Sequence, residues 1–133
     1  MRKGLWRWGP VLAWMLVIYA ISSIGNLPKV DRGPIDTLMH KSAHLLEYAI
    51  LAVLLVRAMR SDRPIGRREI VIALIVVALY GASDEWHQSF VNGRDSEAWT
   101  VGLDTIGGVI GVLVWRWWRQ RIGNESANAR FNE

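Results

Sequence analysis

Four long apolar stretches, separated by short polar segments, make up most of the chain. Apolar runs of this length, without the strict alternation of polar and apolar positions found in strands, predict helices. Proline and glycine mark the segments between them. The sequence therefore predicts an all-α domain over residues 1–122, followed by a polar, disordered tail over 123–133. The four expected helices cover about residues 10–25, 38–59, 69–88 and 101–119.

The composition favours a membrane protein. Hydrophobic residues make up 51% of the 133 positions, and many of the eight tryptophans lie beside arginine near the ends of the apolar stretches. Tryptophan and arginine prefer the interface between membrane and water, so this placement is typical of transmembrane helices. The first stretch resembles a signal peptide but has a longer apolar part, which indicates a retained anchor. We therefore expect a four-helix transmembrane bundle.

The distribution of positive charge predicts the orientation of this bundle. Twelve of the sixteen Lys and Arg residues lie in the N-terminal segment, the 57–68 loop and the C-terminal end. The positive-inside rule places these segments in the cytoplasm. We expect a multi-pass protein of the plasma (inner) membrane with both termini cytoplasmic (N-in/C-in) and two external polar loops. Because the basic residues form short clusters beside apolar segments, we expect contact with membrane lipids and no binding of nucleic acid.

The helices are short for a membrane. The apolar parts of the second and third stretches, residues 45–58 and 70–83, hold fourteen residues each. Fourteen helical residues span about 21 Å, whereas the hydrocarbon layer is about 30 Å thick. Polar groups at the external helix ends are therefore expected to lie below the outer membrane surface.

Polar residues interrupt the apolar pattern at these external ends. In the third helix, Asp84, His87 and Gln88 are three and four residues apart and share one face, with Glu85 beside them. The second helix carries a polar stripe at the same helical spacing, formed by His40, Lys41, His44, Glu47 and Tyr48. Ionisable groups inside membrane segments usually serve function.

The fourth helix contributes Asp104 near its start, and we expect Arg94 of the preceding loop to be its partner. Further along this helix, Gly107, Gly108 and Gly111 form a small-residue face on which another helix can pack closely.

Three interpretations of the polar residues stay open. His44, Glu47, Asp84 and His87 form two pairs at i, i+3 that together could hold a divalent metal such as zinc. Alternatively, a desolvated His or Glu acts as a general base without metal, while Lys41 and Arg94 hold a phosphate or pyrophosphate. In the third interpretation Asp104, Arg94, His87 and Glu47 form a structural network between helices that locks the bundle.

The polar residues form a motif that resembles a known family. It comprises Lys41-x-x-His44-x-x-Glu47-Tyr48, then Tyr80-Gly81-x-x-Asp84-Glu85-x-His87-Gln88-x-Phe90-x-x-Gly93-Arg94, then Asp104-x-x-Gly107. This pattern, over about residues 36–115, is similar to that of the VanZ-like family of small membrane proteins, named for a teicoplanin-resistance protein. The resemblance implies a role in the cell envelope and, for some members, reduced susceptibility to lipophilic glycopeptides.

These observations favour an envelope protein that binds or modifies an amphiphilic molecule at the outer leaflet. A lipid-linked wall precursor and the tail of a lipoglycopeptide are the two expected kinds of partner. A non-enzymatic membrane partner or assembly factor is the main alternative, and a small transporter is a third. If the protein is an enzyme, we expect an acid-base or metal-dependent hydrolase or transferase. The candidate catalytic residues are His44, Glu47, Asp84, Glu85 and His87, and the candidate substrate-binding residues are Lys41, Tyr48, Gln88, Arg94 and Asp104.

Overall fold

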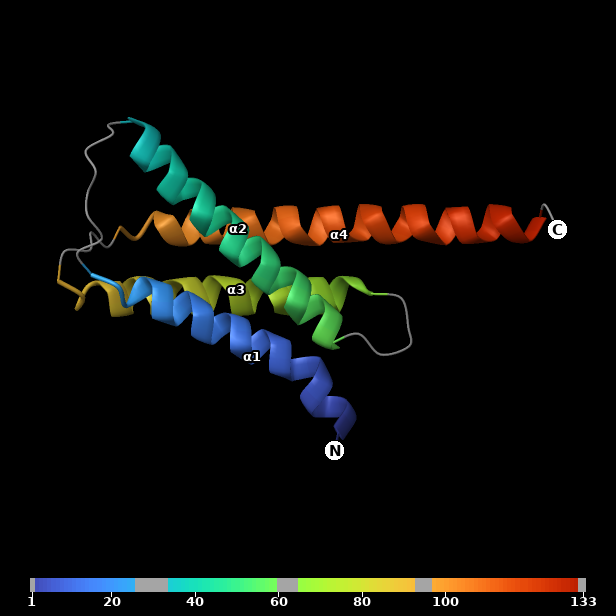
Figure 1. Cartoon of the computed structure of the whole chain (residues 1–133), viewed down its shortest axis with the longest axis horizontal. Helices are drawn as coiled ribbons and strands as arrows, with labels where there is room; N and C mark the ends of the chain where they lie inside the picture. Colours follow the sequence, from blue (N-terminus) through green and yellow to red (C-terminus); the bar gives the residue numbers. More distant parts are fainter. Residues whose placement is uncertain (1, 26–33, 60–64, 93–96, 132–133) are drawn as a thin grey trace.

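The protein is all-α in the part of the chain that the structure describes. The computed structural model describes residues 2–25, 34–59, 65–92 and 97–131, and these contain helices and connecting turns but no strand. The four helices are α1 (Arg2–Ser22), α2 (Pro34–Met59), α3 (Arg67–Gln88) and α4 (Thr100–Phe131) (Figure 1). The predicted number and order of helices are confirmed.

Two helix boundaries differ from the prediction. α1 begins at Arg2 and not near residue 10, so that Pro10 lies inside it. A proline inside a helix removes one backbone hydrogen bond, and the helix continues through it. α4 runs to Phe131 and not to about residue 119, and it takes in most of the segment predicted to be a disordered tail. No proline interrupts it, and each residue added to an existing helix gains one hydrogen bond.

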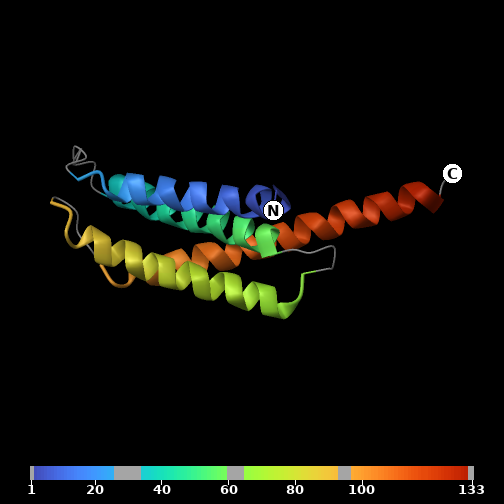
Figure 2. The same cartoon turned by 90° about the horizontal axis from the view of Figure 1, so that it is seen from below.

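The helices alternate in direction. The ends of α1 and α3 therefore meet the starts of α2 and α4 at one end of the molecule, at the left in Figure 1. Seen from below, α1 and α2 lie on one side and α3 and α4 on the other (Figure 2). α2 packs most extensively on α4 and also contacts α1 and α3, so it is the central helix. We call the end where the four helices meet the polar end, for the residues described below.

The core is small and centres on α2. Tyr48, Leu51 and Ala52 are completely buried in it, and residues of the other three helices pack around them. Outside this core, large apolar side chains stay exposed on every helix, and Leu16, Leu46, Leu79 and Leu113 are the clearest examples. A water-soluble monomer rarely exposes so much apolar surface.

Two segments are long and apolar enough to cross a membrane: Lys41–Met59 of α2 and Arg67–Gln88 of α3. These segments and the exposed leucines on all four helices indicate a membrane protein. In a membrane, lipid tails would cover the exposed apolar side chains.

The close contact between α2 and α4 depends on two glycines. A Cβ atom at Gly107 would collide with the backbone of Leu45, and one at Gly111 with the backbone of Ala49. Gly108 faces a neighbouring side chain instead, because a Cβ there would lie 3.1 Å from Cγ1 of Val77. The predicted small-residue face is therefore present, and two of its three glycines let the helix backbones touch.

Replacing either backbone-facing glycine by alanine should destabilise the bundle. In Gly107→Ala or Gly111→Ala the new methyl group forces α2 and α4 apart, and overpacking of this kind typically costs about 1–3 kcal/mol. The measurement is thermal unfolding of the full chain in detergent.

Gly102→Ala provides the matched control. A Cβ at Gly102 meets no atom within 4 Å, and the residue lies in the same helix. Alanine favours helix over glycine, so this variant should unfold at the wild-type temperature or above it. If all three variants unfold together, the α2–α4 contact does not depend on these glycines.

Candidate functional site

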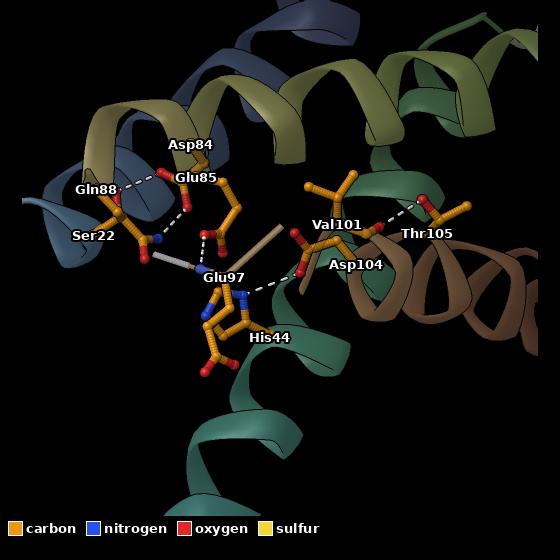
Figure 3. A network of polar contacts seen from close by, with 9 residues as sticks. All are labelled: Ser22, His44, Asp84, Glu85, Gln88, Glu97, Val101, Asp104 and Thr105. Carbon is orange, nitrogen blue, oxygen red and sulfur yellow. Dashed lines mark hydrogen bonds and ion pairs between the residues drawn. The ribbon is translucent and has the colours of Figure 1, made fainter. Parts of the chain in front are cut away.

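Six buried polar side chains gather at the polar end and come from all four helices. Five of them lie in the last or first turns of α1, α3 and α4, and His44 lies about three turns into α2, where that helix passes α4 (Figure 3). They are Ser22, His44, Asp84, Glu85, Gln88 and Asp104. Four of these six positions were predicted from the third-helix motif and the second-helix stripe, Asp104 was predicted from the fourth helix, and Ser22 was not predicted.

The first group joins α1 to α3. Ser22 Oγ donates a hydrogen bond of 2.5 Å to Oδ1 of Asp84, and Gln88 Nε2 donates one of 2.8 Å to Oδ2 of the same carboxylate (Figure 3). Asp84 and Gln88 are one helical turn apart on α3, as their spacing predicted. Both oxygens of this buried carboxylate are therefore paired. Ser22 ends the first apolar stretch, and only its place in an apolar segment could have indicated a buried role.

The second group joins α2 to α4. His44 Nδ1 lies 3.0 Å from Oδ1 of Asp104, and the two residues are 6% and 1% exposed. Because an ionised carboxylate can only accept, Nδ1 carries the hydrogen of this bond. When His44 also carries a second proton, the pair is a buried ion pair.

Two buried polar atoms beside this pair have no hydrogen-bond partner among the described residues. They are Oδ2 of Asp104 and the hydroxyl of Tyr48. Tyr48 is fully buried one turn below His44, and their rings are parallel, with centroids 6.4 Å apart. On the other side, Gly81 gives Asp104 room, because a Cβ there would lie 2.8 Å from Oδ2. An unpaired buried polar atom costs about 1–3 kcal/mol.

Glu85 lies between the two groups and contacts the segment before α4. Its Oε2 accepts a hydrogen bond of 3.0 Å from the backbone N–H of Glu97 (Figure 3). The carboxylate of Glu97 accepts a hydrogen bond from the indole of Trp99. The ammonium group of Lys41 lies 4.8 Å from the centre of the Trp99 ring. Lys41 and Trp99 are exposed, so they form a rim around the buried residues.

His87 faces α1 and not the His44–Asp104 pair. Its Nε2 lies 3.0 Å from Oγ of Ser23, and its ring lies 4.6 Å from the ring of Tyr19. His87 is partly exposed, and both of these contacts are with uncharged side chains. Ser23 and Tyr19 were not predicted as neighbours, because a sequence does not show how α1 is rotated against α3.

The four residues proposed as metal ligands are not assembled into one site. His44 pairs with Asp104, Asp84 pairs with Ser22 and Gln88, and His87 contacts Ser23. In residues 2–25, 34–59, 65–92 and 97–131, no three His, Asp or Glu side chains are placed to hold a metal ion together. The i, i+3 spacing is present, but the two histidines face different neighbouring helices.

Of three further predicted residues, only Glu47 has described surroundings. Glu47 is partly exposed, and its backbone carbonyl accepts a hydrogen bond of 2.9 Å from the indole of Trp14. Arg94, the expected partner of Asp104, and the side chain of His40 lie outside the described residues. Within those residues, the partner of Asp104 is His44.

A comparison with protein families identifies the chain. The family model described as VanZ/LLP1 matches residues 7–119, which include every buried polar residue of the polar end. The chain belongs to the VanZ/LLP1 family. No curated protein and no solved structure matches it. The predicted family resemblance is confirmed, and the polar end is the part of this VanZ/LLP1 chain where its motif residues meet.

The His44–Asp104 pair has the geometry of a base held by a carboxylate. Asp104 fixes one ring nitrogen of His44, and the other nitrogen, Nε2, points away from Asp104 (Figure 3). A carboxylate in this position sets the tautomer of the imidazole and stabilises the imidazolium that forms when Nε2 takes a proton. Glu47 and Glu85 also interact electrostatically with His44. Of the two described histidines, His44 is therefore the better placed general base.

The His44–Asp104 pair should show strong coupling in a double-mutant cycle. His44→Leu leaves the Asp104 carboxylate buried without its donor, and breaking a buried pair in this way typically costs about 3–5 kcal/mol. Asp104→Leu leaves a neutral imidazole and should cost less. The double variant should be more stable than His44→Leu alone. Thermal unfolding of the four proteins in one detergent gives the coupling, and additive losses would show that the two side chains do not interact.

Proposed function

We propose that this VanZ/LLP1 chain is a multi-pass plasma-membrane protein whose polar end binds or modifies the polar group of an amphiphilic molecule at the outer leaflet. Its four helices cross the membrane, and both termini are cytoplasmic. The exposed apolar residues on all four helices and the excess of Lys and Arg at the opposite end support this arrangement.

The His44–Asp104 pair is the observation that carries the proposal. A carboxylate that is 1% exposed in an apolar bundle is costly, and only one of its oxygens has a described partner. The hydroxyl of Tyr48 is also buried without a described partner. A molecule with hydrogen-bonding groups would pair with these two groups, which have no partner among the described residues.

The surroundings of the pair favour an amphiphile with a phosphate or sugar group. Lys41 at the rim carries a positive charge beside the aromatic face of Trp99, and both are exposed. Lysine binds phosphate, and an indole face packs against sugars and apolar chains. A lipid-linked wall precursor and a lipoglycopeptide carry such groups on an apolar tail. The family, named for a teicoplanin-resistance protein, fits this class.

In an enzymatic form of this function, His44 Nε2 takes a proton from a water or substrate hydroxyl, and Asp104 stabilises the imidazolium. The oxygen that loses the proton attacks the phosphorus of the substrate's phosphate group, the bond from phosphorus to the leaving oxygen breaks, and that oxygen takes the proton from His44, as in a hydrolase or transferase. In a binding form, the same groups hold the polar head without reaction. Both forms use His44, Asp104 and Lys41, and they differ in whether a product forms.

A structural role is the second candidate, and the Ser22–Asp84–Gln88 group favours it. Each oxygen of Asp84 is paired within the protein, so this group is complete without a ligand. It connects α1 to α3, as a locking network would. In this interpretation the protein is a membrane partner or assembly factor.

Matched substitutions separate these functions. Asp84→Asn and Ser22→Ala should lower the unfolding temperature. They should reduce activity only in proportion to the decrease in the amount of folded protein. Lys41→Gln, at an exposed position, should leave the unfolding temperature nearly unchanged, and His44→Gln, which keeps a polar amide beside Asp104, should lower it less than His44→Leu does. These two should weaken binding of teicoplanin or undecaprenyl pyrophosphate about tenfold or more, because each removes a group that contacts the polar head. Binding to the purified protein and teicoplanin susceptibility of expressing cells are the measurements.

The pattern of losses decides between the candidates. Loss of product formation in His44→Gln with retained binding supports the enzymatic form, and loss of binding supports the binding form. His87→Gln is the control, since His87 faces α1. If His44→Gln and Lys41→Gln bind both probes as well as the wild type does, the polar end is not the ligand site.

Reporter fusions test the orientation. The basic asymmetry predicts that a reporter inserted after Arg60 is cytoplasmic and that one inserted after Asn92 is external. Alkaline phosphatase, active only outside, and green fluorescent protein, fluorescent inside, give opposite signals at each position. Phosphatase activity after Arg60 would place the polar end on the cytoplasmic side and contradict the proposed outer-leaflet location.

A further inference from the structure

The C-terminal part of α4 continues beyond the ends of the other three helices (Figures 1 and 2). Val112 is the last buried side chain in the described part of this helix. After it, the described side chains up to Gly123 are exposed, except that Trp115 is half-buried. Trp115 still packs against the core, and the bundle does not cover the described residues of α4 that follow it.

Tryptophan and arginine alternate in this region, which we call the α4 collar. It consists of Trp115, Arg116, Trp117, Trp118, Arg119 and Arg121. No acidic residue lies between Asp104 and Glu125, so the collar carries an uncompensated positive charge along α4. The guanidinium of Arg119 lies 5.6 Å from the Trp115 ring centre, and that of Arg121 lies 4.6 Å from the Trp117 ring centre.

The collar surrounds the helix. Successive helical residues are about 100° apart, so Trp115 and Trp117, with the arginines that cover them, point to nearly opposite sides of α4. A protein partner packed on α4 would contact one side of it. Lipid head groups surround a helix that leaves the membrane, and their phosphates complement arginine on every side. The geometry therefore favours lipid over protein.

The distance along α4 agrees with an interfacial position. Thirteen residues separate Asp104 from Trp117, which corresponds to about 20 Å of helix. The apolar parts of α2 and α3 give nearly the same length, about 21 Å. Both estimates are roughly 10 Å shorter than the hydrocarbon layer of a bilayer. If the collar lies among the head groups of one leaflet, the polar end lies below those of the other, or the bilayer is thinner there.

We propose that the α4 collar binds the head groups of anionic phospholipids at the membrane face opposite the polar end and thereby sets the depth of the bundle. This rests on the membrane-spanning arrangement proposed above. The collar holds His44 and Asp104 beneath the outer head groups, where a lipid-linked molecule reaches them from the side of the bilayer. The depth of the polar end then follows from the length of α4 between Asp104 and Trp117.

The lipid preference of the full chain tests the collar. Native mass spectrometry of the wild type should show tighter binding of phosphatidylglycerol than of phosphatidylcholine, and the difference should shrink with added salt. In the triple variant Arg116→Gln, Arg119→Gln, Arg121→Gln, affinity for phosphatidylglycerol should fall about fivefold per arginine, on the order of 100-fold in all. The matched control replaces Arg57, Arg67 and Arg68 by Gln, which removes the same charge from exposed positions of α2 and α3.

The control variant at Arg57, Arg67 and Arg68 should keep most of the preference for phosphatidylglycerol over phosphatidylcholine. The collar triple variant should lose this preference. Equal loss in both would show that total charge, and not the collar, attracts the lipid. A wild type without preference for phosphatidylglycerol would also overturn the proposal. Circular dichroism verifies that each variant is folded, and because the substituted arginines are exposed, we expect unchanged spectra.

The absence of cysteine from the sequence allows depth to be measured directly. Single spin-labelled cysteines at the exposed positions Leu79 and Leu113, both outside the collar, report depth in bilayers through their relative contact with oxygen and a water-soluble nickel complex. In the triple variant the depths of the labels at Leu79 and Leu113 should both differ from their depths in the wild type. Unchanged depths would contradict the anchoring role of the collar. Teicoplanin binding at the polar end is measured separately. If the wild type prefers phosphatidylglycerol but does not bind teicoplanin, the proposed function is contradicted and the collar proposal is not.

Discussion

The polar end depends on how closely α2 and α4 approach each other. Gly107 and Gly111 bring the two backbones into contact at Leu45 and Ala49. His44 directly precedes Leu45, and Asp104 lies one turn before Gly107, so the same contact places the two side chains 3.0 Å apart. A hydrogen bond weakens steeply with distance, so even a methyl group between the backbones would separate the pair. The glycines therefore determine the site as well as the packing.

α1 is held to α2 and to α3 by polar contacts as well as by the core. Trp14 donates to the backbone carbonyl of Glu47, and Tyr80 donates a hydrogen bond of 2.6 Å to the backbone carbonyl of Met15. Each carbonyl has a second lone pair beyond its helical hydrogen bond, so neither contact disrupts a helix. Between apolar surfaces, where lipid competes with side chains for packing, such directional bonds fix how α1 is rotated against its neighbours.

Sequence reasoning predicted this fold well because its signals are local. The lengths of the apolar stretches predicted four helices, and the glycines of the fourth predicted a close helix contact. Partner choice was harder to predict, because it depends on the rotation of whole helices. Arg94 was the expected partner of Asp104, whereas His44 is its partner in the described residues. Ser22 was missed because a serine at the end of an apolar segment does not reveal its partner until Asp84 is placed opposite it.

The same rotation explains why two motifs with identical spacing differ in chemistry. His44 and His87 each have a carboxylate three residues away, Glu47 and Asp84, yet neither histidine bonds to that carboxylate in the contacts described. His44 meets Asp104 from another helix and gains a charged partner, whereas His87 meets the neutral Ser23. The chemistry available to each histidine at the polar end therefore depends on the helix that it faces. The close contact between α2 and α4 gives His44, and not His87, a carboxylate as its hydrogen-bond partner.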